Sequence, residues 1–446
     1  MGSRGEAGAA ASEDGQKTPF EGKLSAVAKS RTPSRLRSLA PALAIPDVIW
    51  LAGGLPSGDV FPLTSVSITT KYGEAITMDA PAEMYAMQQY NLNAAGYKPL
   101  LDWATDHTAA MHKPPNDKWK VLVTCGNSDA MAMLFESLLD AGDVLLVEES
   151  NFAASMSTLH PVAAGGARIE PVPLEPDGSI SSRGLEAVLE KLAGEGLRPK
   201  LLYTVPTGQN PTGASMSLQQ LQAVYDICCS HDILVMEDDP YWYLQFPEPG
   251  SDPPGLQALA SSFLSIDTQA RVVRLDSLAK FLAPGFRGGW ITAPEPLHTS
   301  LVIRTTQSSH GQSSISSVMF HRLLVEWGEQ GLHRHLQRLQ AEYARRAALV
   351  VKEAEAQLQG LAEWAAPRAG MFLWLRVLDV EDTEALMAQL ETHKVVLVPG
   401  RFFSFHDAPS PCFRLCFASA GDEALVEGVR RLASVLREKR QEASAC

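Results

Sequence analysis

The chain has 446 residues, of which 45% are hydrophobic and 20% charged. A chain of this length can fill large cores and form two or three domains. Its formal net charge of −13 argues against nucleic acid as a partner, because binding to phosphates requires a surplus of lysine and arginine. Charges interrupt the apolar runs, so no stretch approaches the roughly 20 residues of a membrane-spanning helix.

The N-terminal segment 1–20 is rich in Gly, Ala, Ser and Glu. It lacks the hydrophobic core of a signal peptide and the acid-poor composition of a transit peptide. We therefore expect a disordered tail and a cytoplasmic protein. The cysteines show no metal-ligand spacing, so we expect reduced thiols and no metal. They are Cys125, Cys228, Cys229, Cys412, Cys416 and Cys446.

Strand-like runs alternate with helical patterns over the middle of the chain. This alternation predicts an α/β fold with a mostly parallel sheet and helices on both faces. The expected strands are 120–123, 144–147, 168–171, 200–204, 233–236, 272–275 and 289–292. We expect them to form a large domain over 75–308, preceded by an N-terminal segment, 21–74, that joins a small domain.

The C-terminal part, 309–446, begins with a long helical pattern over 331–359. Strand-like runs follow at 371–376, 395–398 and 412–417. These elements predict a linking helix and a small α/β domain, with the active site in the cleft between the two domains.

Two turns after predicted strands carry polar side chains that suit a ligand. After the strand near 121–124, Asn127 and Ser128 open a helix and present donors at its positive end, which serves either as a phosphate cup or as an ordinary helix cap. After the strand over 201–205, the turn 207–213 fixes the amide of Asn210; it is either a plain turn or a ligand contact.

The apolar strand over 233–236 ends in Glu237, Asp238 and Asp239, followed by Pro240 and Tyr241. Carboxylates at the end of a buried strand are costly unless they meet a cation, and a pyridinium nitrogen is such a partner. Asp238 would then keep a bound pyridine ring protonated and able to accept electrons.

Lys280 and Arg287 follow the strand over 272–275, at the edge where open α/β sheets bind ligands. A lone lysine is normally a solvated surface group. In combination with the preceding motifs, however, Lys280 indicates pyridoxal phosphate, which needs a primary amine and fixed donors for its phosphate. Arg287, after a Pro-Gly turn, and Ser277 supply such donors.

The strand over 412–417 places Arg414 on the face opposite Phe413, Leu415 and Phe417. A guanidinium in an otherwise apolar strand must find an anion, because it cannot be neutralised. Its planar fork fits a carboxylate through two hydrogen bonds.

In this order, the motifs resemble those of the class I pyridoxal-phosphate aminotransferases of the aspartate aminotransferase fold. The motif sequences are most similar to those of the kynurenine and 2-aminoadipate aminotransferases and the fungal aromatic aminotransferases. The resemblance rests on three motifs: Leu-Ala-Gly-Gly-Leu-Pro at 51–56, Glu-Asp-Asp-Pro-Tyr at 237–241 and Leu-Gln-Phe at 244–246. The resemblance extends from about residue 23 to about residue 438.

The resemblance implies a fold type I enzyme with a seven-stranded sheet and a role for each matching residue. Lys280 carries the cofactor and moves the proton, Asp238 contacts the pyridine nitrogen, and Tyr241 contacts the ring oxygen. Further implied cofactor ligands are Asn210, Ser277, Arg287, Asn127, Ser128, Phe152 stacked on the ring, and Tyr90 reaching across a homodimer. Arg414 would bind the substrate's α-carboxylate, with Asn210 and Gly54 nearby.

The implied reaction moves the amino group of an aromatic, kynurenine or 2-aminoadipate type amino acid to a 2-oxo acid, with 2-oxoglutarate as the expected acceptor, by a ping-pong mechanism. A pyridoxal-phosphate lyase on the same scaffold shares every anchor residue. The aminotransferase-like effector domain of bacterial transcription regulators is disfavoured, because the short N-terminal segment leaves no room for a winged helix. Arg31, Arg35 and Arg37 cannot be assigned to the substrate pocket or excluded from it.

Overall fold

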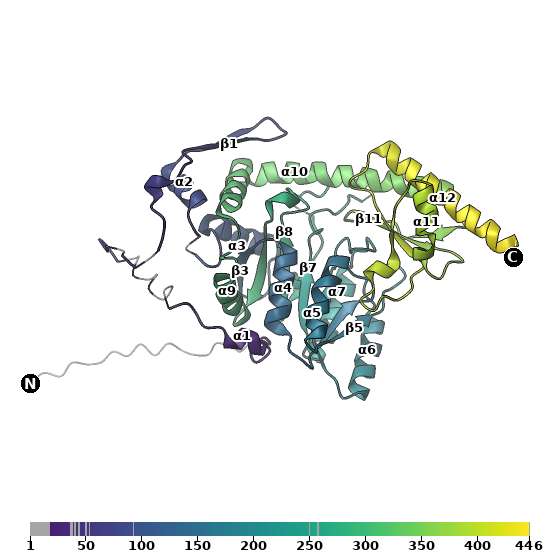
Figure 1. Cartoon of the computed structure of the whole chain (residues 1–446), viewed down its shortest axis with the longest axis horizontal. Helices are drawn as coiled ribbons and strands as arrows, with labels where there is room; N and C mark the ends of the chain where they lie inside the picture. The colour runs from purple at the N-terminus through teal and green to yellow at the C-terminus, as the bar shows by residue number, and fades with distance from the viewer. Residues whose placement is uncertain are drawn as a thin grey trace, which may run out of the picture.

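The computed structural model describes residues 18–35, 39, 42, 45–49, 51–52, 54–91, 93–248, 250–256 and 258–445. Its centre is a seven-stranded sheet with the strand order β3-β9-β8-β7-β6-β4-β5 (Figure 1). All neighbouring pairs are parallel except those made by β9. The strands are β3 (Trp119–Thr124), β4 (Val144–Glu148), β5 (Arg168–Val172), β6 (Pro199–Thr204), β7 (Leu234–Asp238), β8 (Val272–Ser277) and β9 (Gly289–Pro294). The mostly parallel α/β sheet predicted from the sequence is confirmed.

Helices cover both faces of this sheet, which explains why β4, β7, β8 and β9 are buried at every residue. Alternate residues of β6 divide between the faces: Leu201 and Tyr203 pack in one hydrophobic cluster and Leu202 in another. The first cluster includes side chains of α4 (Asn127–Leu138), α5 (Ala153–Ala164) and α9 (Leu297–Gln307), and the second those of α6 (Ser182–Gly194), α7 (Leu218–Ser230) and α8 (Phe263–Ile266).

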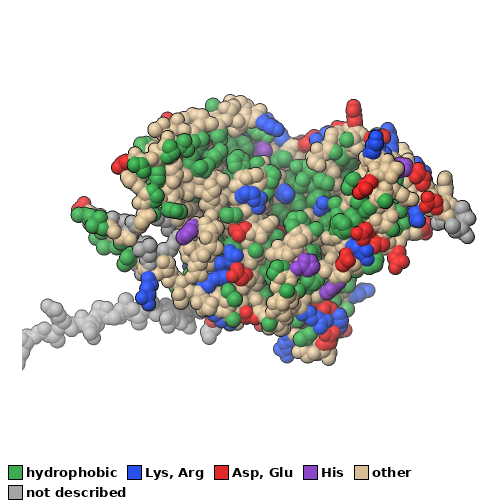
Figure 2. All heavy atoms as spheres, viewed as in Figure 1, with side chains coloured by type: hydrophobic (Ala, Val, Ile, Leu, Met, Phe, Trp, Pro, Cys, Tyr) green, Lys and Arg blue, Asp and Glu red, His purple; other side chains and the backbone are tan. Residues whose placement is uncertain are grey.

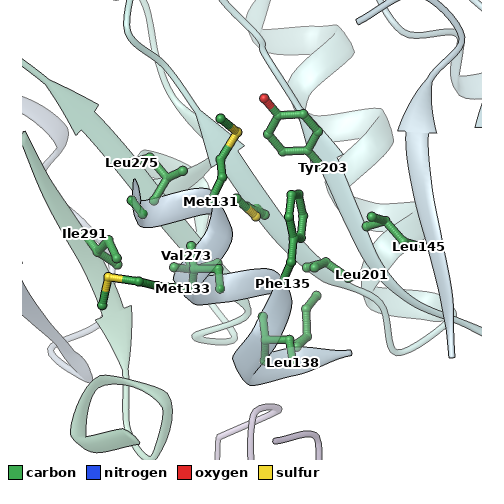
Figure 3. Packing of buried hydrophobic residues seen from close by; sticks show 14 of the residues in the cluster. Met131, Met133, Phe135, Leu138, Leu145, Leu201, Tyr203, Val273, Leu275 and Ile291 are labelled. Carbon is green, nitrogen blue, oxygen red and sulfur yellow. The ribbon is translucent and has the colours of Figure 1, made fainter. Parts of the chain in front are cut away.

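Helix α4 lies directly against the strands of the sheet (Figure 3). Its side chains Met131, Met133, Phe135 and Leu138 face the strand residues, and the rings of Phe135 and Tyr203 meet edge to face with their centroids 5.8 Å apart. This packing fixes the start of α4 beside the ends of β7 and β8, where the candidate site lies.

A smaller antiparallel sheet forms the other end of the molecule, with the strand order β10-β11-β13-β12. Its strands are β10 (Ala362–Glu363), β11 (Phe372–Val377), β12 (Val398–Pro399) and β13 (Cys412–Cys416). It packs against α11 (Met387–Thr392), α12 (Asp422–Ala445) and the last turns of α10 (Ser314–Gln357). The strand expected at 395–398 is shorter, because only Val398 and Pro399 pair with β13.

Helix α10 links the two sheets, and α3 (Lys98–His112) packs beside it. The long run is two helices joined at Gly328, whose φ of 56° and ψ of −172° are not helical. Gly328 can adopt this left-handed φ because it has no Cβ. The helical pattern expected at 331–359 matches the second of these helices.

The described N-terminal part differs from the expectation that 21–74 joins the small domain. Helix α1 (Ala26–Ser30) packs on α4 and α9, next to the large sheet. The hairpin of β1 (Val66–Thr69) and β2 (Ala75–Met78) contacts α10, and α2 (Pro81–Gln88) lies at the same end, far from β11 and α12 in Figure 1. The physical reason is that apolar residues of these elements find partners elsewhere: Ala28 of α1 is buried where the helix packs on α4 and α9, and Met78 of the hairpin packs with Val318 of α10.

The tail expected at 1–20 lies outside the described residues except for 18–20, where Phe20 is fully buried in the large core. In the part of the chain that the structure covers, no helix has the length and apolar character to cross a membrane. The five cysteines in that part are free thiols, and Cys446 falls outside it. Charged side chains are frequent at the right of Figure 2, over α11 and α12, and scarcer at the upper left, near the β1–β2 hairpin.

Candidate active site

Polar residues end the neighbouring strands β8, β7, β6 and β4 at one edge of the large sheet: Ser277, Asp238, Thr204 and Glu148. A cavity of about 280 Å³ opens beside the first two, between the two sheets. Every residue predicted for the site lines it except Tyr90 and Gly54: Asn127, Ser128, Phe152, Asn210, Asp238, Tyr241, Ser277, Lys280, Arg287 and Arg414. The structure thus brings together groups that are up to 287 positions apart in the sequence, from Asn127 to Arg414.

Lys280 reaches the cavity from the turn after β8. Its amine has no hydrogen bond or ion pair among the described residues, and it lies 5.9 Å from the centre of the Tyr241 ring. Burial lowers the pKa of Lys280, and the charges of Arg287 and Arg414 lower it further. A larger share of the amine is therefore neutral and able to attack a carbonyl carbon.

Asp238 lies at the bottom of the cavity and is 3% exposed. The Asn127 amide donates a hydrogen bond to one carboxylate oxygen at 2.6 Å, and the Tyr203 hydroxyl donates to the other at 2.8 Å. Burial raises the pKa of Asp238 to about 6, and these two hydrogen bonds oppose that rise. A buried carboxyl of this kind is stabilised in its charged form by an adjacent cation.

Tyr203 is a site residue that the sequence reasoning missed. The alternation of β6 assigns it to the core with Leu201, and nothing in the local pattern connects its hydroxyl to Asp238. The available signal was general: a buried tyrosine hydroxyl requires a hydrogen-bond partner, and a strand neighbour that ends in a carboxylate supplies one.

Asn127 was expected in a phosphate cup, and its side chain instead contacts Asp238 and the carbonyl of Leu275, the latter at 3.3 Å. The backbone around it keeps the predicted character. No side chain caps the start of α4, so its first N–H groups remain available to an anion.

Arg287 lies beside this helix start. Its guanidinium donates to the carbonyls of Pro284 and Cys125, each at 3.1 Å. A Cβ on Gly126 would come within 2.9 Å of the guanidinium, and Gly126 has a φ of 95°, so the close approach requires glycine. The hydroxyls of Ser277 and Ser128 line the same end of the cavity. Together these groups place hydrogen-bond donors and a positive charge at one end of the cavity.

Arg414 extends from β13 of the small sheet toward the large one. One of its terminal nitrogens donates to the Asn210 side-chain oxygen at 2.8 Å, and its guanidinium lies 4.4 Å from the centre of the Phe372 ring. The Nε atom is buried and has no partner among the described residues. A buried donor of this kind calls for an acceptor, and a substrate carboxylate in the cavity would supply it.

Asn210 also donates to the Tyr241 hydroxyl at 3.5 Å. Its loop is held close to the small sheet, since a Cβ on Gly208 would lie 2.9 Å from the Cα of Gly370. Asn210 therefore stands between the Tyr241 side of the cavity and Arg414.

The adjacent acids Asp238 and Asp239, at the end of β7, have different surroundings. Asp238 lines the cavity, whereas Asp239 pairs with the fully buried Arg274 at 3.0 Å. Glu237 and Asp276 also pair with Arg274, at 3.1 and 2.9 Å. The strand alternation thus sends one acid to the site and its neighbours to a structural ion cluster.

Six residues named in the sequence analysis lie outside the cavity or outside the described residues. Tyr90 is 61% exposed, with its ring 6.2 Å from that of His310, and Gly54 is exposed. Arg31 pairs with Glu136 of α4, away from the cavity. Arg35 does not line the cavity either, and Arg37 lies outside the described residues, as does Gly53 of the 51–56 motif.

Comparisons with known proteins agree with this site. A family model described as aminotransferase class I and II matches residues 86–432. The chain is 33% identical to the Mus musculus protein named kynurenine/alpha-aminoadipate aminotransferase, mitochondrial, over 93% of this chain and 98% of that protein. Among solved structures, the aminotransferase Aro8 from Candida albicans superposes with a TM-score of 0.86 at 28% identity, covering 94% of this chain and 98% of that one.

A second solved structure is LysN, an alpha-aminoadipate aminotransferase from Thermus thermophilus, complexed with N-(5'-phosphopyridoxyl)-L-leucine. It is 25% identical, has a TM-score of 0.67, and covers 77% of this chain and 82% of that one.

The chain belongs to the aminotransferase class I and II family. It is a transferase that moves amino groups between amino acids and oxo acids with pyridoxal phosphate as its cofactor. The resemblance seen in the sequence motifs, the fold type I architecture and the cofactor are thereby confirmed.

Proposed function

We propose that pyridoxal phosphate binds in the cavity beside Lys280 and that the residues lining it take the roles implied by the family motifs. One observation carries this proposal: Lys280 and Arg414 line one cavity, the Lys280 amine and the Arg414 Nε have no partner among the described residues, and Asp238 of the large sheet lines the same cavity. An amine, a guanidinium and a buried carboxyl match the aldehyde, the substrate carboxylate and the ring nitrogen that the reaction brings together.

The phosphate end of the cofactor would lie at the start of α4. The uncapped N–H groups of Asn127 and Ser128, the Ser277 hydroxyl and the Arg287 guanidinium would hold it. The side chain of Asn127 has a different function in this proposal: it orients Asp238 through the 2.6 Å hydrogen bond.

The ring would lie between Phe152 and Val205, over Asp238. Bound pyridoxal phosphate supplies a carbonyl that captures an amine and a ring that accepts the electrons of a broken Cα–H bond. Asp238, ionised and held by Asn127 and Tyr203, would stabilise the positive ring nitrogen. Tyr241 and Asn210 would donate hydrogen bonds to the ring oxygen.

Lys280 would take up the Cα proton of the substrate and return it to the cofactor carbon. Its lowered pKa favours the neutral amine, which is the form that can accept this proton. The Phe152 wall and the closely packed Tyr241 would exclude water from this exchange.

Arg414 would bind the α-carboxylate of each substrate, with the Asn210 oxygen fixing the guanidinium plane. We assign an amino donor of the aromatic, kynurenine or 2-aminoadipate type, 2-oxoglutarate as the acceptor, and a ping-pong order. The name of the Mus musculus relative and that of a solved structure, the aromatic aminotransferase Aro9 from Candida albicans, support these classes of amino donor.

The working unit would be a homodimer in which Tyr90 and Gly54 approach the partner's cavity. Neither residue lines the cavity of its own chain, and both are exposed. Large hydrophobic side chains are exposed nearby at Ile49, Leu51 and Val60, which is typical of a surface that another chain covers.

The division into a segment 21–74, a large domain 75–308 and a small domain 309–446 is part of the proposal, with the helix α1 of that segment on the large-sheet side. A cytoplasmic location also belongs to it; the Bos taurus, Mus musculus and Rattus norvegicus relatives carry the word mitochondrial in their names. Fractionation of cells that express the full chain distinguishes the two compartments.

The test is a panel of amino donors, L-phenylalanine, L-kynurenine and L-2-aminoadipate, each incubated with the purified protein and 2-oxoglutarate while glutamate is measured. We expect glutamate to form in proportion to the donor consumed. Donor breakdown without 2-oxoglutarate would instead identify a lyase, and absence of glutamate with every donor would contradict the proposed acceptor.

A further inference from the structure

Glu148 is a buried carboxylate that does not line the cavity. It ends β4, is 2% exposed, and has no ion pair among the described residues. Its Oε1 accepts hydrogen bonds from the Thr204 hydroxyl at 2.6 Å and the Val205 N–H at 3.2 Å. Its Oε2 accepts from the Asn151 amide at 2.8 Å and the Gln209 amide at 2.9 Å.

One of these donors, Asn151, leads to Phe152. Asn151 donates to Glu148 and, through its own side-chain oxygen, accepts the Phe152 N–H at 2.7 Å. The bond to Glu148 therefore fixes the amide that holds the Phe152 backbone. Phe152 is the wall of the cavity against which the cofactor ring is proposed to stack.

A second donor, Gln209, leads to Asn210. Gln209 donates to both Glu148 and the Ser150 carbonyl, and its oxygen accepts the Thr212 N–H, the last two at 2.8 Å each. Gln209 thereby ties the loop to Glu148 just before Asn210 and to Thr212 just after it. Asn210 is the residue that contacts Arg414 and Tyr241. A single carboxylate thus connects the loop after β4 with the loop after β6.

The acceptor must be a carboxylate. An ionised carboxylate only accepts hydrogen bonds and has about four lone-pair sites, which match the four donors. A glutamine would point its NH₂ group at two of those donors and leave them unpaired in a buried place. Burial raises the pKa of Glu148 to about 7, and the hydrogen bonds from Thr204, Gln209 and Val205 favour the charged form that the donors require.

We propose that Glu148 is a positioning residue that sets Phe152 and Asn210 at their distances from the cofactor and the substrate. This inference rests on the proposed function, because it assigns Phe152 to the cofactor ring and Asn210 to the arginine that binds the substrate. Glu148 itself touches neither ligand.

The experiment compares Glu148→Gln with Glu149→Gln. The control removes a charge one residue further on, where the carboxylate is exposed and accepts only the Leu174 N–H at 3.0 Å. Each protein is stripped of cofactor and titrated with pyridoxal phosphate by fluorescence, the visible circular dichroism of the loaded protein is recorded, and kcat and KM are measured for the amino donor.

For Glu148→Gln we expect cofactor affinity to fall at least about tenfold, the visible dichroism to change, and the KM of the amino donor to rise at least about tenfold. Glu149→Gln should stay within about twofold of the parent, since the side chain at this position is exposed. A Glu148→Gln protein that only melts earlier, with parental cofactor affinity and dichroism, would show a purely structural residue and overturn the proposal.

Two single-arm variants keep the proposal testable if Glu148→Gln does not fold. Asn151→Ala cuts the arm to Phe152 and should weaken cofactor binding while leaving KM near the parental value. Gln209→Ala cuts the arm to Asn210 and should raise KM more than Asn151→Ala does. The reverse order would overturn the proposal. Failure of the parent protein to bind pyridoxal phosphate in the same titration would overturn the proposed function, whereas loss of only these contrasts would overturn this inference alone.

Discussion

The two ends of the cavity are built from different parts of the molecule. The phosphate end consists of the start of α4, Ser277 and Arg287, all of which belong to the large sheet and its connections. The carboxylate end depends on Arg414, from the small antiparallel sheet, meeting Asn210, from a loop of the large one. The geometry of the phosphate end is fixed by the core of the large sheet alone. The geometry of the carboxylate end depends on how the two sheets are placed relative to each other.

This difference suits the two ends of the cavity to different ligands. Groups held within one packed core keep their geometry whether or not a ligand is present, which suits a cofactor that stays bound. A contact across two sheets can loosen when they shift, which suits substrates that enter and leave in each half-reaction. Variants at the two ends should therefore differ in whether cofactor binding or substrate binding is affected.

The largest expected effect is that of Lys280→Ala. Removing the amine eliminates both the covalent anchor and the proton carrier, so turnover should fall by at least about 10⁴-fold. Because Arg287 and the start of α4 are unchanged, the variant should still bind pyridoxal phosphate. Turnover is followed by glutamate formation and binding by absorbance, and a variant that turns over at the parental rate would refute the role of Lys280.

Asp238→Asn should cost less, about 10²- to 10³-fold in kcat, because the ring nitrogen loses its negative partner while the phosphate end is intact. Asp239→Asn is the comparison. Its carboxylate pairs with Arg274 outside the cavity, so the expected result is a lower melting temperature with kcat near that of the parent. If Asp239→Asn lost kcat and Asp238→Asn did not, the assignment of these neighbours would be reversed.

Arg414→Ala should cost about 2–5 kcal/mol in substrate binding, the usual effect of removing one partner of a desolvated ion pair. Both half-reactions present the same α-carboxylate, so amino acid and oxo acid should weaken together, with cofactor affinity little changed. Absorbance changes of the cofactor measure each half-reaction separately. Loss of only one half-reaction would place Arg414 at a side-chain pocket.

The smallest expected effect concerns pH and the cofactor-free protein. Burial raises the pKa of Asp238 to about 6 from an ordinary value of 3.8, so between these values the folded protein holds a proton that the unfolded chain releases. The stability from this group is therefore complete below about pH 4 and is lost as pH rises through 6, a difference of about 3 kcal/mol. Urea unfolding of the cofactor-free parent and Asp238→Asn proteins at pH 4 and pH 7 measures this contribution of Asp238 to stability. An equal pH dependence in both proteins would contradict the raised pKa of Asp238.

Local chemistry made the phosphate end and the ring end predictable from the sequence. Lys280 and Arg287 follow a strand, Asp238 ends one, and the position of each is set by the edge of a single parallel sheet. Arg414 could be recognised for another reason, because a charged residue on an apolar strand has to find an anion.

Long-range contacts account for what could not be predicted. The hydroxyl of Tyr203 meets Asp238 only because β6 and β7 are neighbours, and the Asn127 side chain turns toward that carboxylate from a helix 111 positions away. The packing of α1 on α4 and α9, rather than on the small sheet, also depends on surfaces that a local pattern does not reveal. Glu148 carried no motif at all, and its role emerges only from the four donors that the fold collects around it.

The central claim is that Lys280 is the residue to which the cofactor attaches. The most direct measurement is to load the purified protein with pyridoxal phosphate, reduce it with borohydride, digest it and locate the added phosphopyridoxyl mass by peptide sequencing in a mass spectrometer. We expect the mass on Lys280 alone, and none on the Lys280→Ala protein treated in the same way. A mass on another lysine of the parent, or a parent that stays unlabelled, would contradict the claim.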